Sequence, residues 1–88
     1  MTNDERVAEI ERRLTAALQP IHIDVEDESY LHAGHEGARS GKGHFAVNIK
    51  SSHFKGMTPI ARHRLIYSVL AELMDTDIHA LRITAHVD

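Results

Sequence analysis

The sequence predicts an α+β domain whose elements follow the order helix, strand, strand, helix, strand. Two segments, one near the N-terminus and one after Pro59, carry apolar residues at helical spacing. Three other segments alternate apolar and polar residues, which is typical of half-buried strands. The second helix connects the second and third strands, so these strands are expected to be parallel, with a right-handed connection. We therefore expect one domain over residues 1–88, with a three-stranded mixed sheet and both helices packed on one of its faces.

The first helix is expected over residues 3–18. Thr2 and Glu5 fit a capping box, and acidic residues in the first turn suit the positive end of the helix dipole. The helix ends before Pro20, because proline cannot continue the backbone hydrogen bonds. The predicted apolar stripe consists of Val7, Ile10, Leu14, Ala17 and Leu18. The predicted solvated face, with weak local ion pairs, consists of Glu9, Glu11, Arg12 and Arg13.

Two strands follow, separated by a long loop. Apolar residues alternate with polar ones from Ile21 to Glu26, and again from Phe45 to Ile49, so the second strand is expected over residues 44–51. Consecutive strands joined by a loop are expected to pair antiparallel. Residues 30–43 contain four glycines and are predicted to lack regular structure. A loop of this length in so small a domain is usually functional.

The second helix is expected to begin with Thr58 as its cap and Pro59 in its first turn. It should continue to about Met74 and end at the polar residues 75–77. The third strand should follow from Ile78, with strict alternation from Leu81 onward. The residues expected to face the sheet from the helix are Ile60, Ile66, Val69, Leu70 and Leu73.

Four residues in and before this helix receive specific predictions. Phe54 is expected to anchor the turn that precedes the helix, and Gly56 is expected at a bend. His63 is predicted at the edge of the buried stripe, where it would be hydrogen-bonded rather than a metal ligand. Tyr67 is predicted in the core, with its hydroxyl near water.

The composition restricts the chemistry and the partners. The chain has no cysteine, which excludes disulfides, thiol nucleophiles and thiolate metal sites within it, but it has eight histidines. The net charge of −3 argues against a dedicated nucleic-acid-binding protein. The charge is segregated, however, because no acidic residue lies between Gly37 and Ala71. A surface divided in this way is an argument about partners rather than about fold.

Several classes of protein are not expected. No apolar run approaches the ~18 residues of a membrane span, and the N-terminus lacks the apolar core of a signal peptide. We therefore expect no membrane partner and a cytoplasmic protein, or a matrix or plastid protein after removal of a transit peptide. The chain contains no P-loop, dinucleotide fingerprint, nucleophile elbow or H-E-x-x-H motif. We expect neither enzymatic activity nor a small-molecule substrate.

Six short motifs follow one another at characteristic spacing. They are Asp27-Glu28-Ser29, His32-Ala33-Gly34-His35, Gly43-His44-Phe45, Phe54-Lys55-Gly56, Arg62-His63-Arg64-Leu65-Ile66-Tyr67 and Ile78-His79-Ala80-Leu81. Taken together they resemble the BolA family, over nearly the whole chain. The resemblance implies a fold similar to the class II KH domain, in agreement with the element order above. It also implies two functions, which are partnership with monothiol glutaredoxins in iron–sulfur cluster handling and DNA-binding transcriptional regulation linked to stress and morphology.

The first of these functions depends on histidines. From the sequence alone, the favoured interpretation of His79 is a histidine at the start of a strand that hydrogen-bonds a nearby backbone group, since metal sites need several donors. The resemblance implies instead that His79 is a ligand of a [2Fe–2S] cluster shared with a glutaredoxin and its glutathione, present only in the complex. In the family the second ligand is a histidine or cysteine from the loop before the second strand. His32, His35 and His44 are all candidates here, since there is no cysteine.

The second function would use double-stranded DNA as the partner and the basic residues in and before the second helix as the contacts. These are Arg62, Arg64, Lys55 and Lys50. A solvated basic face is the simpler reading of the same residues. The G-x-x-G sequence Gly34-His35-Glu36-Gly37 lies between strands and contains an acid, so we do not expect it to clamp a nucleic-acid backbone in the KH manner. A third hypothesis is an interaction module that binds a glutaredoxin without any metal.

Overall fold

The computed structural model describes residues 1–32 and 41–88, except for the side chain of His32. Its elements are α1 (Asn3–Leu18), β1 (His22–Asp27), the 3₁₀ turn η1 (Ser29–His32), β2 (Gly43–Lys50), the 3₁₀ turn η2 (Ser52–Phe54), α3 (Pro59–Val69), α4 (Ala71–Thr76) and β3 (Ile78–His86). The capping box at the start of α1 is formed by Thr2 and Glu5, as predicted. This helix and all three strands lie within two residues of where the sequence places them.

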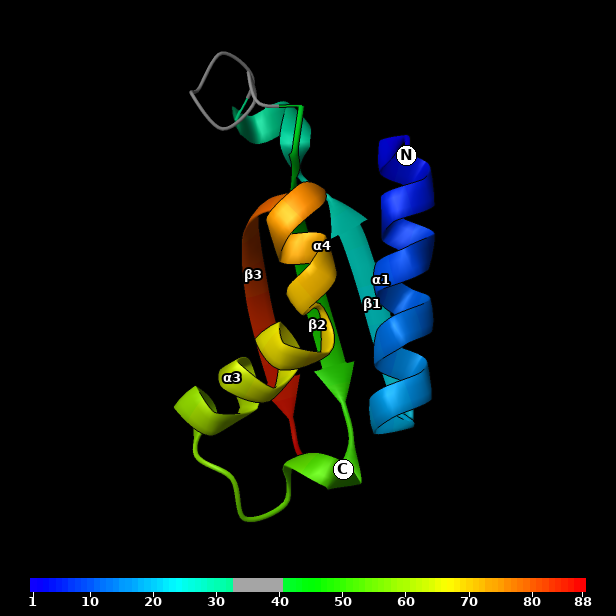
Figure 1. The fold of residues 1–88 in the computed structure, drawn as a ribbon. Helices are drawn as coiled ribbons and strands as arrows, with labels where there is room; N and C mark the ends of the chain where they lie inside the picture. Colours follow the sequence, from blue (N-terminus) through cyan, green and yellow to red (C-terminus); the bar gives the residue numbers. More distant parts are fainter. Residues whose placement is uncertain (33–40) are drawn as a thin grey trace.

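The three strands form one sheet in the order β1-β2-β3. β1 and β2 are antiparallel, with His22 opposite Lys50 and Asp27 opposite Phe45. β2 and β3 are parallel, connected through α3 and α4. Figure 1 shows α1, α3 and α4 on the same side of this sheet. The predicted α+β fold, with a mixed sheet and helices on one face, is therefore confirmed.

The core lies between the sheet and the helices. Alternate residues of β2 are buried, which places their side chains toward the helical layer. Phe54, in the turn η2, is completely buried, so its predicted role as an anchor is confirmed. Ala17 was predicted to face the core from α1 but is exposed. The buried core residues are Ile10, Leu14, Leu18, Phe45, Val47, Ile49, Phe54, Ile66, Leu70, Leu73 and Ile78.

The second helix is not the single helix that the sequence predicts. It is divided into α3 and α4 at Leu70, whose φ of −98° and ψ of 13° leave the helical region. The Ser68 hydroxyl donates to the Leu65 carbonyl oxygen at 2.7 Å, a contact that often bends helices. After the break, α4 continues to Thr76, beyond the predicted end. Leu70 and Leu73 are nonetheless both buried, so the break preserves the predicted apolar contacts with the sheet.

Three predictions for the outer side of α3 are wrong. Ile60 is 64% exposed, because it lies in the first turn of the helix before the chain packs on the sheet. His63 is exposed and does not border the buried stripe. Tyr67 is 39% exposed rather than part of the core. Its hydroxyl lies 3.4 Å from the carbonyl oxygen of Leu81, so the ring leans across the outer edge of β3.

The connection between β1 and β2 begins with more structure than predicted. One 3₁₀ turn, η1, covers residues 29–32, although 30–43 was expected to have no regular structure. The Asp27 carboxylate accepts the Ser29 backbone N–H at 2.9 Å, which starts this turn immediately after β1. His35 and the remainder of the predicted G-x-x-G sequence lie outside the described residues. The bend predicted at Gly56 is confirmed by a φ of +79°, which favours glycine.

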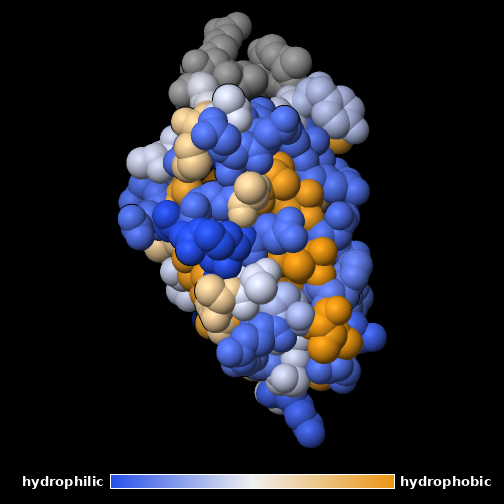
Figure 2. Space-filling model, turned by 90° about the vertical axis from the view of Figure 1, so that its right-hand side faces the viewer, coloured by the Kyte–Doolittle hydropathy of each residue, from blue (hydrophilic) through white to orange (hydrophobic). Residues whose placement is uncertain are grey.

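The surface on the α1 side of the molecule is mostly hydrophilic, with apolar side chains in separate small patches (Figure 2). This agrees with the predicted solvated face of α1, where Glu9 pairs with Arg12 and Arg13. Within residues 1–32 and 41–88, none of the helices has the length and hydrophobicity required to cross a membrane.

Candidate functional site

A β-bulge at the start of β3 determines where His79 lies. Gly43 of β2 is opposite Ile78, but the next residue, His44, is opposite Ala80. His79 is therefore an extra residue on β3 without an opposite residue on β2. Bulges redirect the side chain of the extra residue and occur often beside functional sites. The exposed ring of His79 is thus presented at the end of the sheet rather than in the regular alternation of the strand.

His44 lies directly beside this bulge. The centres of the His44 and His79 rings are 5.1 Å apart, with an angle of 54° between the ring planes. His44 lies at the start of β2, the central strand, and is only 6% exposed. Its backbone N–H donates to the Ser29 hydroxyl at 3.0 Å, and its carbonyl oxygen accepts the Glu28 N–H at 2.7 Å. His44, the buried member of the pair, is therefore firmly held, whereas His79 is accessible.

Of the four predicted metal ligands, the described structure brings His79 and His44 together. The backbone of His32 ends the turn η1, directly after Leu31, and the His32 side chain is not described. His35 lies outside the described residues. Among the residues that the structure describes, no group of three or more histidine, cysteine or acidic side chains could hold a metal ion. A metal centre on the histidine pair would therefore require ligands beyond this described set.

A shallow groove lies beside the histidine pair, between the end of β1 and the start of β3. Leu31, which lines the groove, is 57% exposed, and the residue before it in the chain, Tyr30, is 75% exposed. The ion pair between Arg82 and Glu28, 2.6 Å apart, crosses the same region. This hydrogen bond from Arg82, together with the charge of Glu28, raises the pKa of the Arg82 guanidinium. The groove is lined by Glu28, Leu31, His44, Phe45, Ala80, Leu81 and Arg82.

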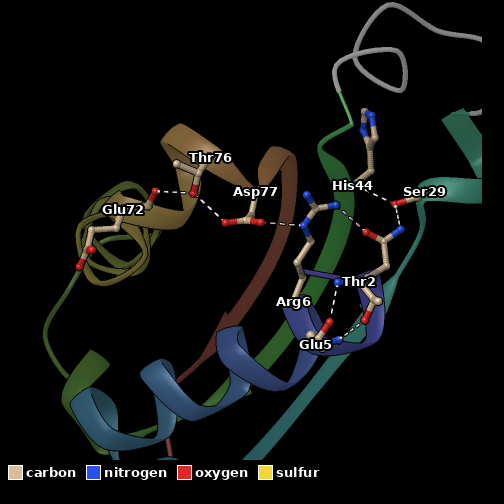
Figure 3. Close-up of polar contacts among 9 residues, drawn as sticks. Thr2, Glu5, Arg6, Ser29, His44, Glu72, Thr76 and Asp77 are labelled. Atoms are coloured by element: carbon tan, nitrogen blue, oxygen red, sulfur yellow. Dashed lines mark hydrogen bonds and ion pairs between the residues drawn. The ribbon is translucent and has the colours of Figure 1, made fainter.

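Sequence reasoning did not assign a role to two ion pairs at this end of the molecule. Glu28 lies in one of the six motifs, but its partner Arg82 is 54 residues away. Arg6 of α1 donates to the Asp77 carboxylate at 2.8 Å, between side chains that are only 13% and 12% exposed (Figure 3). Hydrogen bonds from the Thr76 hydroxyl and then from Arg6 lower the pKa of the Asp77 carboxyl. No local pattern signals either pair, because each depends on how the helices and strands pack.

The four predicted nucleic-acid contacts do not have equivalent surroundings. Arg62 donates to the carbonyl oxygens of Met57 and Ala85, at 3.1 and 3.0 Å, and so joins the start of α3 to the end of β3. Arg64, Lys55 and Lys50 are exposed. Lys50 lies on the sheet, in register with His22 and His86, and not on the helix. The three exposed side chains remain available to a partner, whereas the Arg62 guanidinium already joins two parts of the fold.

The comparison with protein families matches the description "BolA-like protein" to residues 14–87. This chain belongs to the BolA-like family. Its curated relatives include "Protein BOLA1, chloroplastic" from Arabidopsis thaliana, 40% identical over 85 residues, which are 93% of this chain and 53% of that protein. Another is "DNA-binding transcriptional regulator BolA" of Escherichia coli (strain K12), 47% identical over 72 residues, 82% of this chain and 66% of that protein. The chain thus spans about half of the plant relative.

The solved structures agree with the family assignment. The BolA domain of SufE1 from Arabidopsis thaliana superimposes with a TM-score of 0.83 at 38% sequence identity, covering 93% of this chain and 91% of that domain. The resemblance that the six motifs indicate is therefore confirmed as family membership. The BolA-like fold of this chain presents a histidine pair at a bulge, exposed apolar side chains beside it, and basic residues elsewhere on its surface.

Proposed function

We propose that this BolA-like chain is a non-enzymatic adaptor that binds a monothiol glutaredoxin and shares a [2Fe–2S] cluster with it. His79 would be one ligand, and the second would be a histidine among His32, His35 and His44. The glutaredoxin and its glutathione would supply the thiolates. A cluster held partly by histidine has a higher reduction potential than one held by thiolates alone, which suits cluster transfer or iron sensing.

The observation that carries this proposal is the exposed ring of His79 beside His44 at the bulge. A ligand shared with another protein has to be accessible from outside, and His79 is exposed. Two imidazoles that bind one metal at ~2 Å and at a near-tetrahedral angle have ring centres about 5 Å apart. The 5.1 Å separation of the His44 and His79 rings fits that requirement. The histidines are also the donors expected for a borderline metal in a chain without cysteine.

Different observations favour each candidate for the second ligand. The His44 ring centre lies 5.1 Å from that of His79, although His44 is only 6% exposed. His32 directly follows Leu31, which lines the groove next to the pair. His35 shares with His32 the sequence segment that the BolA resemblance indicates. We therefore keep all three and distinguish them by single substitutions.

Reconstitution with a monothiol glutaredoxin, glutathione, iron and sulfide tests the proposal. We expect a visible circular dichroism spectrum that differs from that of the glutaredoxin alone, and that is lost or altered with His79→Ala. The matched control is His86→Ala, which removes an exposed histidine from the other end of β3 and should leave the spectrum unchanged. Among His32→Ala, His35→Ala and His44→Ala, the variant that alters the spectrum identifies the second ligand.

Two outcomes of this reconstitution would contradict the cluster proposal. A wild-type mixture with the spectrum of glutaredoxin alone would show that no shared cluster forms. The second outcome is that the glutaredoxin binds the wild type and His79→Ala equally well and that no new spectrum appears. This would support an interaction module without metal.

A second candidate function is DNA binding, because a relative that is 47% identical is named a DNA-binding transcriptional regulator. We propose Arg64, Lys55 and Lys50 as the contacts, since these predicted residues are exposed. Arg62 would act indirectly, by holding α3 against β3 through its two backbone contacts. Stress response and morphology are the processes in which such a regulator would act.

If this second function is present, Arg64→Ala should weaken DNA binding and reduce the salt slope by about 1, because one phosphate contact is lost. Arg62→Ala should mainly lower the free energy of unfolding, by about 1–3 kcal/mol, because two hydrogen bonds from a charged group are removed. The matched control is Arg12→Ala on α1, which should change neither. Measurements of DNA affinity at several salt concentrations, with chemical unfolding of each variant, test this. Affinity that does not depend on salt would rule out these contacts.

A further inference from the structure

The first turn of α1 contacts residues that directly adjoin the two strands carrying the histidine pair. The Arg6 Nε donates to the Asp77 carboxylate at 2.8 Å, and its Nη1 donates to the Asn3 side-chain oxygen at 2.9 Å. The Asn3 side-chain nitrogen in turn donates to the Ser29 hydroxyl at 3.3 Å. Figure 3 shows Arg6 between Asp77 on one side and Ser29 and His44 on the other. Arg6 and Asn3 thus lie at the centre of one hydrogen-bonded network.

One arm of the network reaches the bulge that holds His79. Asp77 is the last residue before β3, and its carbonyl oxygen accepts the Gly43 backbone N–H at 2.9 Å. Gly43 is opposite Ile78, and the extra residue, His79, follows immediately. Arg6 holds the side chain of Asp77. The backbone of Asp77 in turn fixes Gly43, whose pairing with Ile78 lies directly next to the bulge. A change in the Arg6–Asp77 contact would therefore be transmitted to the start of the bulge.

The other arm reaches His44. The Ser29 hydroxyl accepts the His44 backbone N–H at 3.0 Å, as well as the hydrogen bond from Asn3. The packing around Gly43, the residue before His44, is tight. A Cβ added to Gly43 would lie 2.5 Å from the Phe45 ring and 3.1 Å from the Asn3 side-chain oxygen. The first turn of α1 is thus packed against the backbone that positions His44.

We propose that Arg6 and Asn3 are positioning residues that set the spacing between His44 and His79. Neither contacts the two imidazoles. They act through the backbone on each side of the bulge, with Arg6 acting on β3 and Asn3 on β2. This inference rests on the proposed function for its biological role, and on His44 among the three candidates for the second ligand, because the spacing of this pair matters to a metal that both histidines bind. Groups that hydrogen-bond a metal ligand directly typically change metal affinity by roughly 10- to 100-fold when they are removed, and for Arg6 and Asn3, which act through the backbone, we expect the lower end of that range.

The spacing can be measured in the free chain, independently of any partner. Nuclear Overhauser effects between the ring protons of His44 and His79 should be present in the wild-type chain and be lost or strongly reduced in Arg6→Ala. Asn3→Ala keeps the Arg6–Asp77 contact, so it should be the milder variant and should mainly move the His44 signals. The matched control is Arg12→Ala, which removes an exposed arginine from the same helix and should leave the effects unchanged.

A purely structural role for Arg6 predicts a different result. Arg6→Ala would then lower the unfolding temperature, but the folded chain would keep the wild-type ring contacts. That outcome, or unchanged ring contacts in both Arg6→Ala and Asn3→Ala, would overturn the proposal. In the reconstituted complex, we expect Arg6→Ala to release the cluster to a chelator roughly tenfold faster. If His79→Ala leaves the spectrum of the complex unchanged, the shared cluster is rejected. The ring contacts in the free chain would still decide whether the spacing of His44 and His79 depends on Arg6.

Discussion

Replacing Phe54 by alanine is expected to lower the free energy of unfolding by about 3–5 kcal/mol, the range for removing a fully buried aromatic side chain. Phe54 is completely buried, although it lies in a turn of only three residues. This turn is fixed at its start by Ser51. The buried Ser51 hydroxyl caps it by accepting the His53 N–H at 3.1 Å and donates to the Leu18 carbonyl oxygen at 2.6 Å. The surrounding backbone is therefore poorly able to collapse into the space that the ring leaves.

Chemical denaturation of the wild type and Phe54→Ala would measure this loss. The matched control is Tyr30→Ala, which removes an aromatic ring that is 75% exposed and should change stability by no more than about 0.5 kcal/mol. The histidine pair is at the opposite end of β2 from this turn, so folded Phe54→Ala should keep the contact between the His44 and His79 rings. A loss no larger than that of the control would show that the ring does not anchor the turn.

The fold could be predicted from the sequence because the periodicity of the apolar residues is undisturbed in most elements. Alternation around Val47 and helical spacing around Leu14 identify the buried faces of β2 and α1. The parallel pairing of β2 and β3 follows from the helical connection between them. The break at Leu70 was not predictable, because the apolar spacing continues through it and only the local contact of Ser68 accompanies the change in backbone direction.

The site was predictable in part. His79 could be selected by its motif, but its place in a bulge could not, although the sequence contains a signal. Ile78 and Leu81 both face the core, and their spacing of three residues is incompatible with a regular strand. One extra residue must therefore interrupt the alternation between them. The adjacent position of His44 depends on the register between β2 and β3, which the sequence alone does not define. Arg6 was beyond prediction, because its partner Asp77 is 71 residues away.

Removal of the Asp77 carboxylate is expected to produce the second large effect. Asp77→Ala should lower the free energy of unfolding at neutral pH by about 3 kcal/mol, the lower end of the range for breaking a buried ion pair. The reason is that Arg6, only 13% exposed, would lose its carboxylate partner and keep the contact with Asn3. The matched control is Asp75→Asn, at an exposed carboxyl near the end of α4, the helix that precedes Asp77, which should change stability by no more than about 0.5 kcal/mol.

The same pair predicts how stability depends on pH. Hydrogen bonds from Thr76 and Arg6 lower the pKa of Asp77 in the folded chain below its ordinary value of 3.8. Because the unfolded chain binds the proton more readily, the stabilisation is complete above that value and is lost as the pH falls toward the lower pKa of the folded state. The stability difference between wild type and Asp77→Ala should therefore narrow on acidification below about pH 4. Urea unfolding of both proteins at a series of pH values measures this stability difference. If the difference stays constant to pH values well below the ordinary pKa of Asp77, the carboxylate charge does not stabilise the fold.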